Sequence, residues 1–211
     1  MLKVKNIEVI GLEGAIRGMR NPMDSWKHID SEYDENNPRQ YNVGEKDLGL
    51  MKRLCKAGTE HAKFMRMIHI QFDLTTNAIV WAEFETYKVG VTRNSCSKMH
   101  RIHVKPFTED MFSTEGIGEV SYAKEELSRV LDTLNKLRED FNKTKDKKYW
   151  RAMLELLPHG YNMKATIDMN YQNAQNIIKQ RRNHKMQEWN VLCDELLKLP
   201  YMSELIGQKE G

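Results

Sequence analysis

The residues best able to bind or react with a ligand gather in the stretch 91–101, which is dense in small and polar groups such as Ser95 and Ser97. This composition predicts a loop, and binding residues favour loops that a rigid scaffold holds in place. His100 and His103 close the stretch in a His-x-x-His spacing. Two histidines without a neighbouring cysteine or carboxylate pattern make a poor metal site, so we expect no metal.

Other reactive or aromatic side chains have plain structural interpretations when each is taken alone. His61 stands where a predicted helix meets a predicted strand, a place typical of a structural histidine. Arg181 would ordinarily lie on a solvated helix face. Trp81, Phe84 and Tyr87 recur at helical spacing, which indicates core or interface packing rather than a stacking platform.

The composition indicates a soluble globular protein that stays where it is made. The chain has 211 residues, of which 40% are hydrophobic and 30% charged, which suits one domain with a sizeable core. The net charge is only +3, so no broad basic face for nucleic acid is expected. The three cysteines form no C-x-x-C pair, and neither a targeting signal nor an apolar run of about 20 residues is present. We therefore expect a cytoplasmic protein without nucleic-acid or membrane partners.

The apolar periodicity predicts one α+β domain over 1–211, whose strands and helices position the polar stretch. The chain is expected to begin with a strand over 2–12, a short helix over 13–19 and a polar loop over 27–44. A helix through Leu48–Cys55, ended by Gly58, should follow. Next come a strand over 67–74 and a helix that Thr75 or Thr76 caps and that runs to about Val89. The second half is expected to hold helices over 119–143 and 149–156, and a long helical region over 166–197 broken near Asn183 and His184.

The stretch Tyr87–Met99 resembles the signature of flavin-dependent thymidylate synthases, which reads R-H-R-x-x-S-x-N-E-x-S-x-R. The matching positions are Thr92, Asn94 and Ser97, where the signature has Ser, Asn and its second Ser. The departures are Tyr87, Lys88 and Val89 in place of R-H-R, Ser95 in place of Glu, and Met99 in place of the last Arg.

Three further blocks extend the resemblance to about 55–195 in the same order and spacing. Thr59–Phe64 resembles the E-H element that precedes a strand and the signature helix in this family. Downstream, Leu157-Pro158 precedes Asn170 by the interval that the family uses. From there the family reads N-x-R-x-x-x-N/H-x-x-x-x-R-x-x-x-x-A-Q-W, and this chain has Asn170, Gln172, Asn176, Arg181 and Met186-Gln187 at those places.

The resemblance implies an α+β fold with a mixed or antiparallel sheet packed with long helices, and a homotetramer. It implies FAD as cofactor and methylation of dUMP, a pyrimidine deoxynucleotide, with methylenetetrahydrofolate as co-substrate. By position, Arg181 would stabilise negative charge on the carbonyl-N3 edge of the pyrimidine. The implied cofactor-binding residues are His61, Lys88, Asn170, Gln172 and Asn176. The implied substrate-binding residues are Glu85, Ser95, Ser97 and Arg181, with Ser97 toward the phosphate.

The departures from the signature remove several guanidinium groups, and a lysine does not reproduce the fork of an arginine. We therefore expect FAD to bind weakly or to be lost. Arg93, Lys98 and Arg101 are candidates to compensate. Three functions stay open at this point: methylation or another C5 alkylation of a pyrimidine nucleotide, altered flavin chemistry, and a non-catalytic nucleotide-binding protein that keeps the fold.

The resemblance predicts a homotetramer in solution, because this family builds each of its sites from several subunits. Static light scattering at micromolar concentration is expected to give four times the mass of the 24.8 kDa chain. A stable monomer would contradict the expectation and would weaken the assignment of site residues.

Overall fold

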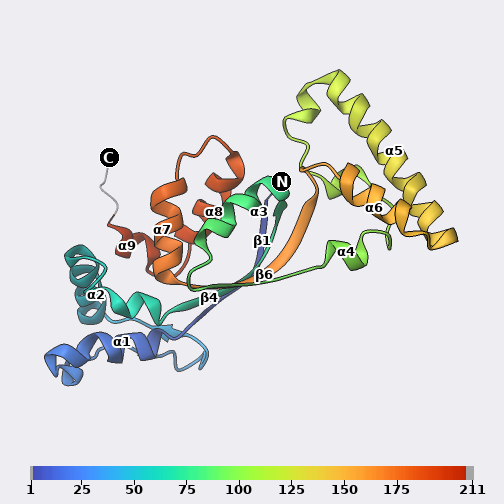
Figure 1. The fold of residues 1–211 in the computed structure, drawn as a ribbon. Helices are drawn as coiled ribbons and strands as arrows, with labels where there is room; N and C mark the ends of the chain where they lie inside the picture. The colour runs from blue at the N-terminus through green and yellow to red at the C-terminus, as the bar shows by residue number, and fades with distance from the viewer. Residues whose placement is uncertain (1, 208–211) are drawn as a thin grey trace. The chain divides into compact units, whose positions relative to one another are not determined.

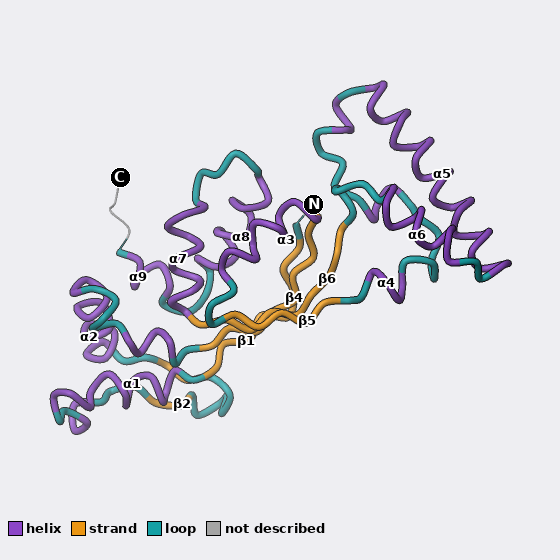
Figure 2. Tube along the Cα trace, viewed as in Figure 1, coloured by secondary structure: helices purple, strands orange, loops and turns teal. Residues whose placement is uncertain are grey.

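The computed structural model describes residues 2–207 and has the α+β architecture that the sequence predicts, combining helices with an antiparallel sheet (Figures 1 and 2). The helices are α1 Leu12–Arg20, α2 Glu45–Ala57, α3 Ala78–Phe84, α4 Lys98–Arg101, α5 Ser121–Thr144, α6 Lys147–Leu156, α7 Tyr171–Arg181, α8 Gln187–Leu197 and α9 Met202–Ile206. The strands are β1 Lys3–Ile10, β2 Glu32–Tyr33, β3 Tyr41–Asn42, β4 His69–Asn77, β5 Val91–Ser95 and β6 Asn162–Asn170.

Four strands form one sheet in the order β1-β4-β6-β5, and β2 pairs with β3 in a separate antiparallel hairpin. The chain divides into two compact units. Unit 1 comprises residues 1–5, 73–86 and 93–166, and unit 2 comprises residues 6–72, 87–92 and 167–211. Each strand of the large sheet therefore contributes residues to both units.

Strand β6 corrects the prediction of continuous helix from residue 166. Its side chains alternate in burial, with Ala165, Ile167 and Met169 buried and their neighbours more exposed. This is the two-residue period of a strand with one buried face. Alanine and methionine are good helix formers, so their local preference favours a helix. The pairing of this segment between β4 and β5 makes it a strand.

Two other expectations about element boundaries are wrong. Helix α3 begins after Asn77, not at Thr75 or Thr76, because β4 continues that far and the Asn77 side chain accepts the Val80 N–H at 3.0 Å. The helix also ends at Phe84, short of Val89, and continues as a single 3-10 turn.

The stretch 91–101, expected to be a loop, contains strand β5 and the one-turn helix α4. Strand β5 is polar because it lies at the edge of the sheet and buries little. The expected loop over 27–44 likewise contains the β2-β3 hairpin.

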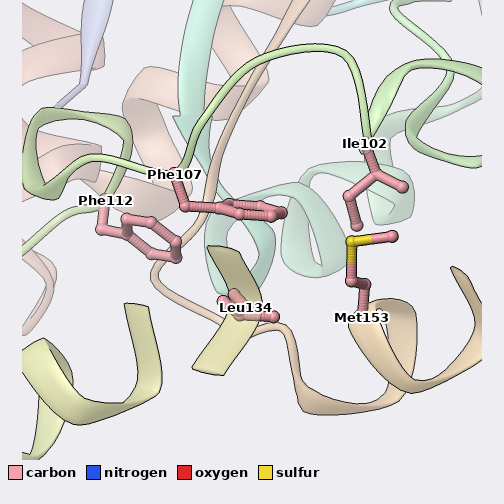
Figure 3. Close-up of a cluster of buried hydrophobic side chains, with 5 residues drawn as sticks. All are labelled: Ile102, Phe107, Phe112, Leu134 and Met153. Carbon is pink, nitrogen blue, oxygen red and sulfur yellow. The ribbon is translucent and has the colours of Figure 1, made fainter. Parts of the chain in front are cut away.

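Unit 1 has its own core beneath the long helix α5, which confirms the apolar stripe expected over 119–143. Figure 3 shows the five buried side chains of this core turned toward one another; they are Ile102, Phe107, Phe112, Leu134 and Met153. The Asn135 side chain on the same helix accepts the Phe107 N–H at 2.8 Å and donates to its carbonyl at 2.9 Å. These two bonds fix the connecting segment that follows α4.

Within unit 2, an ion pair joins Arg20, at the end of α1, to Asp47, in the first turn of α2. The Arg20 Nε and Nη2 atoms each lie 2.6 Å from Asp47 Oδ1, and the Asp47 side chain is fully buried. Asp47 Oδ2 accepts the Ser31 hydroxyl at 2.6 Å and the Asp30 N–H at 3.0 Å. This one carboxylate therefore ties α1, α2 and the intervening chain together.

The Asp30 carboxylate in turn accepts hydrogen bonds from the backbone N–H groups of Lys46 and Asp47, at 2.8 and 3.0 Å, at the start of α2. Burial alone would raise the pKa of the Asp30 carboxyl, but these hydrogen bonds outweigh it and lower the pKa below its ordinary 3.8. A lowered pKa contributes stability that is present above the unfolded value and is lost as the pH falls through the folded value.

Asp47→Ala is expected to lower the free energy of unfolding by about 3–5 kcal/mol, because it leaves the Arg20 charge buried without its partner. Asp194→Ala, which removes an exposed carboxylate on α8, serves as the control and should change stability by less than about 0.5 kcal/mol. Urea denaturation followed by circular dichroism measures both. Equal effects of the two substitutions would show that the ion pair between α1 and α2 does not stabilise the fold.

Candidate functional site

Arg181 is the last residue of α7, and its guanidinium lies among aromatic rings. Its Nε donates to the Tyr87 hydroxyl at 2.9 Å, and Nη1 lies 3.2 Å from His184 Nε2. The guanidinium carbon is 4.7 Å from the centre of the Trp189 ring and 5.7 Å from that of Tyr87. Cation–π contacts of this kind hold a guanidinium in place without neutralising its charge. We call these four residues the Arg181 cluster.

The local sequence explains why this cluster forms. Helix α7 buries its apolar side through Ala174, Ile177 and Ile178, so its last turn carries Arg181 beside the packed interior. The backbone turns at Arg182 and starts again as α8, whose fully buried Trp189 faces both His184 and Tyr87. Arg181 is half-buried, whereas the adjacent Arg182 is exposed.

Tyr87 is the member of the cluster for which the sequence predicted only a core or interface role. It stands where the signature begins with arginine, and it is buried. Its hydroxyl donates to Gln180 Oε1 at 3.1 Å and accepts from Arg181 Nε. A neutral hydroxyl at this position therefore orients the cation of α7 instead of adding a second cation.

The chain after Tyr87 contacts α7 again at its first turn. The Asn173 side-chain amide donates to the Val89 carbonyl at 2.7 Å. Gly90 follows with φ +73°, and a Cβ there would lie 3.4 Å from both Asn170 Nδ2 and Asn173 Oδ1. The positive φ and the close amides both favour glycine at this position.

The predicted cofactor-binding residues of α7 point in different directions. Asn170 precedes the helix and caps it, because its Oδ1 accepts the Asn173 N–H at 3.0 Å. Asn170 therefore lies outside α7, not within the continuous helix expected over 166–197. Gln172 is buried, and its Nε2 donates to Gln175 Oε1 at 3.4 Å, while Asn176 is exposed.

Of the remaining predicted residues of unit 2, His61 and Lys88 both expose their side chains. The backbone N–H of His61 donates to the Gly58 carbonyl in the turn after α2. The backbone carbonyl of Lys88 accepts the Val91 N–H as the chain enters β5. Both side chains are thus oriented toward solvent.

Unit 1 holds the three predicted substrate-binding residues Glu85, Ser95 and Ser97. Glu85 forms a short ion pair with Arg93, whose guanidinium carbon stacks 4.0 Å from the centre of the Trp81 ring. Glu85 is therefore engaged by a cation of its own unit. Ser95 is exposed on the edge strand β5.

Ser97 lies at a small cationic cavity, which we call the Ser97 cavity. Its hydroxyl accepts the His100 N–H at 3.4 Å and so caps α4. The cavity measures about 200 Å³ and is lined by Cys96, Ser97, Lys98, Arg101, Ile102, Tyr161, Asn162, Met163 and Lys164. Lys164 pairs with Asp73 Oδ2 at 2.8 Å, whereas Lys98 and Arg101 form no ion pair with a carboxylate of residues 2–207. Lys164 is not among the predicted site residues, because it comes from β6, which was not predicted as a strand.

Within residues 2–207, no group of three histidine, cysteine or carboxylate side chains is placed so that it could hold a metal ion. No helix in the same part of the chain is both long and apolar enough to cross a membrane.

No family model and no curated protein sequence matches this chain. Solved structures do match. The chain is similar to the flavin-dependent thymidylate synthase ThyX from Helicobacter pylori complexed with FAD and dUMP, with 15% sequence identity, a TM-score of 0.70 and 97% of each chain covered. A second structure of Thymidylate Synthase X from Helicobacter pylori, with FAD and dUMP, gives 15% identity and a TM-score of 0.72 over 99% of this chain and 100% of that chain. These comparisons establish the fold over nearly the whole chain.

Tyr87→Phe is expected to lower the free energy of unfolding by about 1–3 kcal/mol, because it removes the acceptor of Arg181 Nε and the donor to Gln180. Tyr122→Phe, at a tyrosine with 74% of its surface exposed, is the matched control and should have almost no effect. Denaturant titration of the two variants provides the comparison. Indistinguishable stabilities would mean that the Tyr87 hydroxyl does not hold the Arg181 cluster.

Proposed function

We propose that this chain is a diverged flavin-dependent thymidylate synthase that methylates a pyrimidine deoxynucleotide such as dUMP. The observation that carries the proposal is the likeness, over 97–99% of the chain, to an enzyme complexed with FAD and dUMP. The four sequence blocks that resemble the family support it independently. The proposal includes a cytoplasmic homotetramer and methylenetetrahydrofolate as the carbon donor.

In this proposal the Arg181 cluster receives the pyrimidine. Activation of a uracil ring at C5 places negative charge on its carbonyl-N3 edge, and a guanidinium held nearby stabilises that charge. The Tyr87 hydroxyl accepts a hydrogen bond from Arg181 Nε, and this bond fixes the plane of the guanidinium. A fixed donor costs little reorganisation when charge develops, which is the source of its effect on rate.

The Ser97 cavity suits the phosphate of the nucleotide. Met99 stands where the signature has its last arginine and carries no charge, so Lys98 and Arg101 supply the positive charge, and Ser97 supplies a hydroxyl. The cavity volume of about 200 Å³ accommodates a phosphate group. In the homotetramer that we propose, several subunits build each site, so the Arg181 cluster and the Ser97 cavity of one site need not come from the same copy.

The residues present fit the flavin ring better than its phosphates. The Gln172 Oε1 atom is buried without a hydrogen-bond partner in the described part of the chain, and Asn176 presents an exposed amide. Amides of this kind suit a ring that both donates and accepts. For the phosphates, the R-H-R positions offer only the Lys88 ammonium. FAD, when bound, would supply the hydride of the methylation, and we expect its affinity to be low.

A second candidate is a nucleotide-binding protein that keeps the fold without the methylation. One observation favours it: Val89, which stands at the second arginine of the signature, is 83% exposed and has no polar group. The exposed position there offers nothing to a cofactor phosphate. The two candidates share nucleotide binding at Arg181 and differ in turnover.

Arg181→Ala is expected to abolish binding of dUMP, whereas Arg182→Ala should leave it nearly intact. The two arginines are adjacent, but only Arg181 belongs to the aromatic cluster. Arg181→Lys should rescue poorly, because a point charge cannot bond two adjacent ring acceptors as a planar guanidinium can. Isothermal titration with dUMP and dCMP measures all three variants against the wild type.

An activity assay of the wild-type protein with reduced FAD and methylenetetrahydrofolate distinguishes the two candidate functions. It measures whether dUMP is converted to its 5-methyl product. Conversion supports the synthase, and binding without conversion supports the second candidate. Equal dUMP affinities of the wild type and Arg181→Ala would contradict both.

A further inference from the structure

A second cationic cavity lies in unit 2, where α9 packs against α2 and α7 (Figure 1). It measures about 430 Å³, and it shares no lining residue with the Arg181 cluster or the Ser97 cavity, although its residue Gln175 contacts Gln172 of the proposed flavin site. The lining residues are Lys52, Cys55, Lys56, Gln175, Lys179, Glu204, Leu205, Ile206 and Gly207. We call it the α2-α7 cavity.

Among the described residues, three lysines and one carboxylate line this cavity. Lys52 and Lys56 are four residues apart on α2, and Lys179 comes from α7. Within residues 2–207, none of the three forms an ion pair within 4.0 Å, and Glu204 accepts the Ser203 hydroxyl instead. Like charges at this helical spacing destabilise a helix, and a concave wall with an excess of positive charge concentrates anions.

A buried amide forms part of the wall. Gln175 is only 5% exposed, yet it lines the cavity. Its Nε2 donates to the Leu205 carbonyl at 3.5 Å, and its Oε1 accepts from Gln172 at 3.4 Å. Both contacts are at the long limit for hydrogen bonds. The amide has a second N–H that no described residue accepts, and this N–H can serve a ligand oxygen.

We propose that the α2-α7 cavity binds a small phosphorylated molecule. Lysine ammonium groups act as point charges for phosphate, and the Gln175 N–H adds a directional bond. The volume lies in the range of about 300–1,000 Å³ typical of small-molecule sites and exceeds the need of a lone phosphate. Leu205 and Ile206 offer apolar surface to the body of the molecule. The site is separate from the proposed nucleotide site and does not depend on it.

Two cysteines allow each cationic cavity to be tested by itself, because Cys55 lines the α2-α7 cavity and Cys96 lines the Ser97 cavity. Burial raises the pKa of the Cys55 thiol to about 11, so its alkylation is slow and easily timed. The probe is inorganic pyrophosphate, compared with sodium chloride at equal ionic strength. Alkylation by iodoacetamide is followed at each cysteine by peptide mass spectrometry on the full chain.

Pyrophosphate at about ten times its dissociation constant is expected to slow alkylation of Cys55 about tenfold. The Lys52→Ala/Lys56→Ala variant and the Lys179→Ala variant should each lose this protection. Arg53→Ala, which removes an exposed charge of α2 that does not line the cavity, should keep it. Each variant is compared with itself, with and without pyrophosphate, because the lysines also influence the thiol.

Unchanged Cys55 alkylation in pyrophosphate would overturn the proposal, as would equal losses of protection in Arg53→Ala and in the lysine variants. Protection confined to Cys96 would also overturn it while leaving the proposed nucleotide site intact. If pyrophosphate protects Cys55 but not Cys96, the phosphate role of the Ser97 cavity is contradicted and the present proposal stands.

Discussion

The side chain of Asn170 is the constraint on which the candidate site depends. It ends β6 and starts α7 by accepting the Asn173 N–H at 3.0 Å, so the direction of the sheet strand sets the direction of the helix. Asn77 does the same between β4 and α3. An asparagine cap of this kind is typically worth about 1 kcal/mol. Its structural consequence is larger, because α7 carries Arg181 at its far end.

Arg181 then meets a chain segment that contacts α7 at two points. The Tyr87 hydroxyl accepts a hydrogen bond from Arg181 at the last turn of α7. The Val89 carbonyl accepts one from the Asn173 side chain at the first turn. At the position where the signature has arginine, this chain has a tyrosine that adds no charge and instead orients the Arg181 guanidinium. One guanidinium is kept, and the aromatic rings of Tyr87 and Trp189 support it.

The fold class and the main elements could be predicted from the sequence because their signals are local. Helix α5 shows its apolar stripe over more than six turns, and β4 alternates apolar and polar residues. Strand β6 is the main element that the prediction misses. Its apolar residues Met163, Ala165, Ile167 and Met169 alternate with polar ones as in a half-buried strand, but methionine and alanine are also good helix formers. The helix predicted from residue 166 therefore includes Asn170, whereas the structure places Asn170 at the cap that precedes α7.

The candidate site shows the same division. Ser97 was found by its place in a motif, and Arg101 as a nearby base, but Lys164 joins them only through the pairing of strands far apart in the sequence. Tyr87 looked like a core residue and is indeed buried, yet its hydroxyl contacts the residue on which the proposed chemistry depends. A polar atom on a buried aromatic ring has a role that apolar periodicity does not reveal.

We propose that this fold still binds a flavin and a pyrimidine nucleotide. The decisive experiment is titration of the purified chain with FAD, followed by the change in flavin absorption with and without dUMP. We expect weak, saturable binding with one FAD per chain, strengthened by dUMP. A flavin spectrum that stays unchanged throughout the titration, in the presence and in the absence of dUMP, would contradict it.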